Sequence, residues 1–304
     1  GTDNQGLSGI EYSWNSFLSG TAGKSVSLKD ASKSEIANSQ QSYIAAENGY
    51  DLTLTIDSNI QTIVEKKLAE AVEEYKCKSG MTIAMDPSTG KILALADYPS
   101  YDCNSPSSPN STLAKSWDTL SSEEKMNKRF EMWRPKAITD TYEPGSVFKV
   151  ITSAIALEEN ITDTNIKKDF FCSGSTLLEG ADKPIKCYTY PNQHKYQTLT
   201  EALEHSCNPA FIDLGLRIGS ETSYKYYEAL GFFNKTGIEI PGEPKSGIFY
   251  DLNKIKPIEL AVMSFGQRFN ITPIQMISAI SAIANDGIYM KPKIVDKLTN
   301  SDTG

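Results

Sequence analysis

The segment 145–158, GSVFKVITSAIALE, restricts the fold of this chain more than any other stretch. Its apolar residues fall on nearly every side of the helix that the segment predicts: Val147, Phe148, Val150, Ile151, Ala154, Ile155 and Leu157. A helix that is apolar all round is stable only where other elements cover it. We therefore expect this helix in the centre of a domain, where it carries one basic residue, Lys149, into the interior.

The length and charge of the chain limit its class. With 304 residues it can bury a large core, and its 39% hydrophobic and 22% charged residues are typical of a globular protein. The formal net charge of −8 argues against a nucleic-acid partner, because binding to phosphate backbones requires clustered Lys and Arg. Five cysteines are too few for a disulfide-based fold of this size.

Composition divides the chain into two regions. Residues 1–47 are rich in Ser, Gly, Asn, Gln and Lys, so we expect an extended or mobile tail. Residues 48–304 show a strand near 50–56, then a helix, then two strands around the turn DPSTG. Further helices are expected near 198–207, 210–218, 222–230, 257–264 and 273–286. This order predicts an α+β domain with an antiparallel sheet.

Apolar periodicity also predicts which side chains of the first strand and helix face inward. In the strand, Leu52, Leu54 and Ile56 alternate with polar residues, as in a half-buried strand. The following helix places five apolar residues at helical spacing, namely Ile60, Ile63, Val64, Leu68 and Val72.

Ser146 and Lys149 form a Ser-x-x-Lys pair at the start of the apolar helix. Side chains three residues apart on a helix share one face, with Cβ atoms about 5–6 Å apart, so the two can touch. Apolar surroundings lower the pKa of a lysine, and the neutral amine can then deprotonate a serine. The helix N-terminus favours the anion that forms on attack at a carbonyl. Because the tetrapeptide also occurs by chance and serine is an ordinary cap, the pair alone leaves both roles open.

A second motif favours the catalytic role. Ser206 and Asn208 form a Ser-x-Asn element, and Ser-x-x-Lys with Ser-x-Asn are two of the three motifs of penicillin-binding proteins and related β-lactamases.

The chain resembles the transpeptidase domain of class B penicillin-binding proteins over most of residues 6–295. YEPGSVFK resembles the active-site segment of that family. Five further stretches resemble the family in the family's order: GYDLTLTIDSNIQ, AMDPSTGKILALADYPSYD, TLTEALEHSCNPAFIDLGLRIG, TGIEIPGE and FGQRFNITPIQMISAISAIANDG. The SCNP form is most similar to the sporulation and division enzymes of Gram-positive bacteria. The resemblance implies a penicillin-binding and β-lactamase-like fold, with helices on both faces of a central antiparallel sheet. It also implies that residues 1–47 are the remnant of a linker to a non-catalytic domain and that residues 48–304 are the transpeptidase domain.

The resemblance also implies a serine acyltransferase. Ser146 would attack the D-Ala-D-Ala carbonyl of a peptidoglycan stem peptide, with Lys149 as its base. Ser206 would relay a proton toward the leaving amine, and Asn208 would hold Lys149 and the substrate amide. Transfer of the acyl group to a neighbouring stem would make a cross-link, and β-lactams would acylate Ser146. This chemistry requires no cofactor.

The third family motif, Lys-Thr-Gly, is not assigned. The triplets at 235–237 and 245–247 are rejected, because NKTGIEIPGE resembles a separate loop of the family and only 27 residues separate Asn208 from Lys235. We expect the catalytic triplet, with its strand and the following helix, beyond residue 304. The fold is therefore predicted to be truncated at its C-terminus.

Cysteines and histidines lie close to these motifs. Thiolate and imidazole are preferred zinc ligands, and a closed structural site needs four. We consider Cys187, His194 and Cys207 as the core of such a site, with Cys172 or Asp182 as the fourth ligand. Two other interpretations stay open: a disulfide between Cys172 and Cys187, or burial of the cysteines as small apolar residues.

A cell-wall enzyme of this kind is expected at the extracytoplasmic face of the cell membrane. We expect an N-terminal anchor absent from this sequence, and a membrane partner that polymerises glycan. Two other functions are considered: a relative that senses or hydrolyses β-lactams, and a non-catalytic penicillin-binding-like scaffold. The unassigned third motif favours the scaffold, whereas a reactive Ser146 would count against it.

Overall fold

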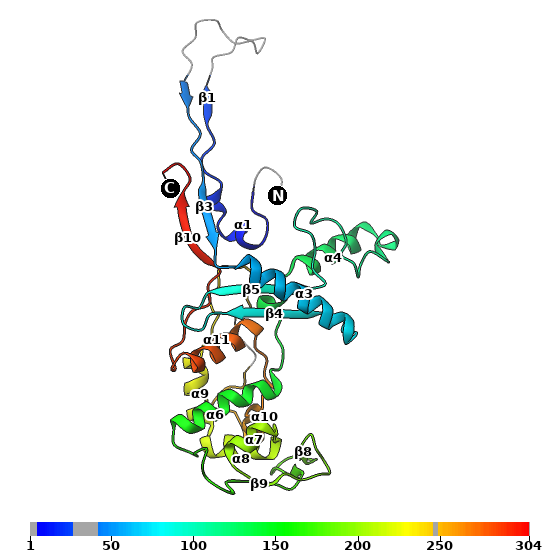
Figure 1. The fold of residues 1–304 in the computed structure, drawn as a ribbon, viewed down its shortest axis with the longest axis vertical. Coiled ribbons are helices and arrows are strands. Elements are labelled where there is room, and N and C mark those ends of the chain that lie inside the picture. The colour runs from blue at the N-terminus through cyan, green and yellow to red at the C-terminus, as the bar shows by residue number, and fades with distance from the viewer. Residues whose placement is uncertain (1–4, 27–41, 246–248, 304) are drawn as a thin grey trace, which may run out of the picture.

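The computed structural model describes residues 5–26, 42–245 and 249–303. The molecule is elongated (Figure 1). A helical body lies at one end, a two-stranded hairpin covered by helices lies in the middle, and a narrow ribbon of strands projects from the other end.

The middle layer is an antiparallel hairpin with helices on both faces. Its elements are β4 (Gly80–Met85), β5 (Ile92–Tyr98), α3 (Ser58–Glu74), α5 (Lys136–Thr139) and α11 (Pro273–Ala284). Successive side chains of a strand point to opposite faces. A Cβ at Gly80 would meet Leu68 of α3, whereas Ile83 packs in a cluster with Ile274 of α11. The sequence prediction of a hairpin around DPSTG between helices is confirmed.

A second pair, β3 (Tyr50–Leu54) and β10 (Val295–Asn300), runs antiparallel beside this layer (Figure 1). The strand after 50 was expected to bury Leu54, but that side chain is 40% exposed. Thr55 is buried instead, because its hydroxyl donates to the carbonyl of Ile92 at 2.6 Å. This contact joins the end of β3 to the central hairpin.

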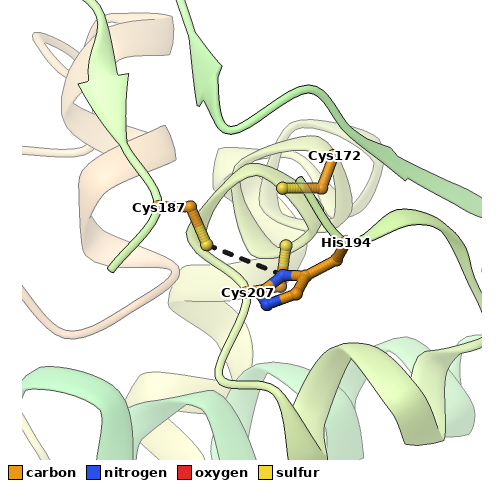
Figure 2. A group of neighbouring side chains, drawn as sticks. All are labelled: Cys172, Cys187, His194 and Cys207. Atoms are coloured by element: carbon orange, nitrogen blue, oxygen red, sulfur yellow. Dashed lines mark hydrogen bonds between the residues drawn. The ribbon is translucent and has the colours of Figure 1, made fainter. Parts of the chain in front are cut away.

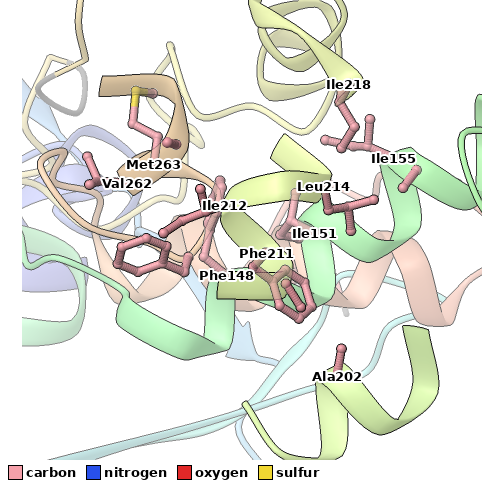
Figure 3. Close-up of a cluster of buried hydrophobic side chains, with 14 of the residues drawn as sticks. Phe148, Ile151, Ile155, Ala202, Phe211, Ile212, Leu214, Ile218, Val262 and Met263 are labelled. Atoms are coloured by element: carbon pink, nitrogen blue, oxygen red, sulfur yellow. The ribbon is translucent and has the colours of Figure 1, made fainter. Parts of the chain in front are cut away.

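The helical body surrounds the predicted apolar helix. It contains η3 (Gly145–Phe148), which is a 3-10 turn, α6 (Lys149–Glu158), α7 (Leu199–Glu204), α8 (Asn208–Ile218), α9 (Ser220–Ala229) and α10 (Pro257–Met263). Phe148, Ile151 and Ile155 are at most 2% exposed and lie in one cluster with Phe211 and Leu214 of α8 (Figure 3). The central position predicted for this helix is confirmed.

The apolar helix differs from the prediction at its ends. Its first turn is a 3-10 turn, and Val147 in that turn is 50% exposed. Leu157, in the last turn, is 40% exposed. The covering elements therefore enclose the middle of the helix and leave the turn that carries Ser146 open to solvent.

A small substructure lies at the tip of the helical body (Figure 1). It consists of two antiparallel pairs, β6 (Phe170–Cys172) with β9 (Lys195–Gln197) and β7 (Ser175–Thr176) with β8 (Ile185–Lys186). β6, β7 and β8 contact α8, so this substructure adjoins the helix that begins at Asn208.

The N-terminal region contains more regular structure than its composition predicts. Its described elements are α1 (Gly9–Ser13), α2 (Asn15–Leu18), β1 (Lys24–Val26) and β2 (Ser42–Ile44), and β1 pairs with β2 as a ribbon (Figure 1). Much of the predicted mobile tail, residues 27–41, lies outside the described residues. Two further helical elements follow β5 of the central hairpin in the chain, η2 (Trp117–Thr119) and α4 (Ser122–Trp133).

The core position of α6 gives a stability prediction. Ile151→Ala should lower the free energy of unfolding by about 2–5 kcal/mol, because it leaves a cavity between α6 and α8. The matched control is Ile63→Ala in α3, since Ile63 is 61% exposed although its spacing predicted an inward position. The control should change the free energy by less than about 0.5 kcal/mol. Chemical denaturation measures both, and equal effects would contradict the packing described above.

Candidate active site

Ser146 lies in the turn η3, directly before α6. Gly145 has a φ of +60°, and its N–H donates to the carbonyl of Gly266 at 2.8 Å. Gly266 has a φ of +81°, and a Cβ there would lie 2.1 Å from the carbonyl oxygen of Gly145. Only glycine permits so close an approach of two backbones. A main-chain contact therefore holds the turn, while the Ser146 side chain stays exposed.

Lys149 is the centre of the site. It is fully buried, and its Nζ lies 3.2 Å from Ser146 Oγ and 2.8 Å from Asn208 Oδ1. The same Nζ lies 2.9 Å from the hydroxyl and 2.7 Å from the carbonyl oxygen of Ser206. The structure thus brings the four catalytic candidates named from the sequence around one amine.

The surroundings of Lys149 favour its neutral form. Burial lowers the pKa of Lys149 from 10.5 to about 8, because the charged amine loses its hydration. The thiols of Cys207 and Cys187 act in the opposite direction, since a negative charge on either would favour the ammonium. Near pH 8 a large fraction of Lys149 is neutral and can accept a proton from Ser146.

Ser206 links the amine to the exposed serine. Its φ of +46° is uncommon for a residue other than glycine, and such conformations cluster at functional sites. Both its carbonyl and its hydroxyl face Lys149, and the hydroxyl also donates to Ser146 Oγ at 2.9 Å. The next residue, Cys207, is fully buried. Ser206 therefore offers a short path for a proton between two groups.

Asn208 is held at both ends of its amide. Its Oδ1 accepts from Lys149, and its Nδ2 donates to the carbonyl of Lys186, the last residue of β8, at 3.1 Å. An amide nitrogen carries two N–H groups, so one remains for a substrate. The contact with Lys186 was not foreseen from the sequence, because a main-chain carbonyl leaves no signature in residue type.

The Lys-Thr-Gly triplet at 235–237 lies in a loop whose backbone binds Glu243. The backbone N–H groups of Thr236 and Gly237 donate to the carboxylate of Glu243 at 2.6 and 3.1 Å, and Thr236 is buried. This loop geometry agrees with the exclusion of the triplet from the catalytic set. The other triplet, at 245–247, lies partly outside the described residues.

Four thiol and imidazole side chains converge beside the four catalytic candidates (Figure 2). They are Cys172, Cys187, His194 and Cys207, and one ligand atom from each lies within 4.8 Å of all the others. Cys187 Sγ and His194 Nδ1 are 3.7 Å apart. All three cysteines are buried free thiols, so the Cys172–Cys187 disulfide is not formed. Asp182, the other candidate for the fourth position, is exposed and lies outside this group.

Two further polar residues border this group and were not singled out for it from the sequence. His205 stacks on His194 with ring centroids 4.8 Å apart, and its Nδ1 lies 2.9 Å from Gln197 Oε1. Gln197 is 2% exposed, and its Nε2 has no hydrogen-bond acceptor within the described residues. The side chain of Gln197 also lies by the thiol of Cys207 and lowers its pKa, opposing the larger effect of burial. Only the fold, which pairs β9 with β6 and places Gln197 opposite Phe170, brings Gln197 to this group.

An exposed serine in contact with a buried lysine of lowered pKa, with a second serine and an amide on the same amine, defines a site for serine acyl transfer. The chain belongs to the family described as the penicillin binding protein transpeptidase domain, whose model matches residues 80–303.

Individual proteins agree with this assignment. The chain is 36% identical over 295 residues to stage V sporulation protein D of Bacillus subtilis, covering 97% of this chain and 42% of that protein. It is 32% identical to peptidoglycan D,D-transpeptidase FtsI of Buchnera aphidicola, over 96% of this chain and 46% of the relative. A solved peptidoglycan synthetase from Bifidobacterium adolescentis matches with a TM-score of 0.81 and 27% identity, over 100% of this chain and 50% of that one. The chain thus spans less than half the length of these two curated relatives.

The penicillin-binding fold and the class B resemblance read from the sequence are confirmed by these comparisons. Among the residues that the structure describes, none of the helices is both long enough and apolar enough to cross a membrane.

The lowered pKa of Lys149 gives a pH prediction. Below a pKa of about 8 the protonated amine cannot accept a proton from Ser146, so the rate constant for acylation by benzylpenicillin should fall about tenfold per pH unit. Above this pKa the rate should level off. Stopped-flow acylation between pH 6 and 9.5 measures the profile. Lys149→Arg is the control, because a guanidinium stays protonated and should leave little acylation at any pH. A flat wild-type profile would argue against a lysine base.

Proposed function

We propose that the protein is a serine D,D-transpeptidase that cross-links peptidoglycan stem peptides through an acyl-Ser146 intermediate. The observation that carries this proposal is the fully buried Lys149 amine, 3.2 Å from Ser146 Oγ, with a pKa lowered to about 8. Membership of the transpeptidase family and the name of the FtsI relative, a peptidoglycan D,D-transpeptidase, support the same reaction.

In the proposed first step Lys149 takes the proton of Ser146 as its Oγ attacks the carbonyl between the two D-Ala residues. The carbon–nitrogen bond then breaks, and the proton passes through Ser206 to the amine of the leaving D-Ala. The 2.9 Å contacts of Ser206 Oγ with Lys149 and with Ser146 support this path. Asn208 keeps Lys149 in position through Oδ1, and the second N–H of its Nδ2 holds the substrate amide.

The second step reverses the roles of the same groups. An amine of a neighbouring stem attacks the acyl-Ser146 ester, gives up a proton through Lys149, and forms the new peptide bond as Ser146 regains its hydrogen. β-Lactams would acylate the same Oγ by opening of their ring. Nucleophile and base are both side chains of the chain, so the reaction needs no cofactor.

Trapping with a β-lactam separates this proposal from a non-catalytic scaffold. Intact-protein mass of the full-length protein should increase by the mass of one penicillin after incubation with benzylpenicillin. Ser146→Ala should show no increase, because the attacking hydroxyl is gone. The matched control is Ser153→Ala in α6, a buried serine on the same helix outside the site, which should still be acylated. A folded protein without the adduct would favour the scaffold, and rapid loss of the adduct would favour the hydrolytic alternative.

The proposed substrates fix where the protein works. Peptidoglycan lies outside the cytoplasmic membrane, so we place the reaction on its outer face, with the expected N-terminal anchor and a glycan-polymerising membrane partner as part of the same proposal. Recovery of the full-length product from the cytosol would argue against this location.

We further propose a structural zinc site at Cys172, Cys187, His194 and Cys207. Tetrahedral zinc with bonds of about 2.0–2.3 Å holds its ligand atoms about 3.5–4 Å apart, close to the spacing observed here. Gln197 Nε2, otherwise without an acceptor, would donate to a Cys207 thiolate. The metal would supply folding stability and leave the acyl transfer to the serine and lysine side chains.

Metal analysis tests the zinc proposal. Purified protein should contain about one zinc per chain, and Cys187→Ser should lose most of it. Loss of the metal should lower the melting temperature by about 5–10 °C, because metal binding stabilises only the folded state. Cys77→Ser is the control, since Cys77 is exposed and outside the group. Full metal content in Cys187→Ser, or none in the wild type, would contradict the proposal.

A further inference from the structure

Lys186 is an exposed cation on the segment that borders the catalytic amide. Its carbonyl accepts from Asn208 Nδ2, which places its backbone at the edge of the site. Its side chain is exposed, and its Nζ lies 4.5 Å from the centroid of the Tyr190 ring. Tyr190 is itself held by a turn in which its N–H donates to the carbonyl of Cys187 at 3.1 Å. The Lys186 ammonium therefore lies over an aromatic face close to the catalytic amide.

The ammonium of Lys186 has no acidic partner within the described residues. Other lysines are paired: Lys91 with Asp296 and Lys67 with Glu70, each at 2.7 Å. No carboxylate lies within 4.0 Å of the Nζ of Lys186 in the described part of the chain. A tyrosine face orients a cation at an exposed site but leaves its charge uncompensated. The position is open to an external anion.

The local balance of charge has the opposite sign from that of the whole chain. The chain carries a net charge of −8, whereas residues 163–195 hold five lysines and four carboxylates. One of those carboxylates, Asp169, is already bound by Arg217 at 2.8 Å. This segment thus has more lysines than carboxylates in an otherwise acidic molecule, which favours approach of an anionic ligand.

We infer that Lys186 is a specificity residue that binds a free carboxylate of the stem peptide on the acyl side of the scissile bond. This inference rests on the proposed function. Stem peptides carry free carboxylates on residues before D-Ala-D-Ala. In the proposed reaction Asn208 holds the amide that precedes the acylated D-Ala. An extended peptide advances about 3.4 Å per residue, so the residues before this amide would pass β8 and come within reach of Lys186.

Two penicillins test the inference in the full-length protein. Benzylpenicillin and carbenicillin share the same ring system, and carbenicillin adds one carboxylate beside the amide of its side chain. The quantity measured is the ratio of their acylation rate constants, carbenicillin to benzylpenicillin. In Lys186→Met this ratio should fall about two- to fivefold, the range that an exposed ion pair contributes. In Lys186→Arg it should stay near the wild-type value.

The matched control is Lys168→Met, which removes the same charge from the same substructure. Lys168 lies in the chain shortly before β6, and its Nζ is 5.7 Å from the centroid of the Tyr196 ring. This control should keep the wild-type ratio, and 0.5 M NaCl should lower the ratio in the wild type but not in Lys186→Met. An unchanged ratio in Lys186→Met, or an equal fall in Lys168→Met, would overturn the inference. A wild type that benzylpenicillin does not acylate would instead overturn the proposed function, and this inference with it.

Discussion

The burial of one lysine amine is the constraint on which the site depends. An ammonium inside an apolar helix is costly unless polar groups surround it, and Lys149 is met by two hydroxyls, an amide oxygen and a carbonyl. These partners come from η3, from the α7–α8 loop and from the start of α8. The same contacts that make burial of this amine tolerable therefore bring together the four proposed catalytic residues. The stability of the helical body and the proposed reactivity of Ser146 would then depend on the same contacts.

The thiol and imidazole group strengthens this assembly by its place in the chain. Cys187 follows Lys186, whose carbonyl holds Asn208, and Cys207 directly precedes Asn208. Each residue of the Asn208–Lys186 hydrogen bond is thus next in the chain to a buried cysteine of this group. Any bond that joins these members, including bonds through a metal, fixes the spacing between β8 and the start of α8.

Much of the site could be predicted from the sequence because local rules govern it. The three-residue spacing of Ser146 and Lys149 and the all-round apolar helix are properties of short segments. Main-chain contacts such as those at Lys186 and Gly266 have no signature in residue type, and Gln197 joins its group only through the pairing of β9. Periodicity also misplaced Leu54 and Ile63, since burial there depends on which neighbours cover the element rather than on spacing.

Three main-chain carbonyls hold the geometry of the site, those of Gly266, Ser206 and Lys186. Every residue has a main-chain carbonyl whatever its side chain. A hydrogen bond to that carbonyl therefore survives substitution wherever the backbone conformation is kept. Position 266 is closed to change, because a Cβ would meet the neighbouring backbone. Position 186 tolerates other side chains, since its own side chain is exposed and only its carbonyl makes the bond to Asn208. The side chain at position 186 can therefore differ between related proteins, while the carbonyl bond that positions Asn208 is kept.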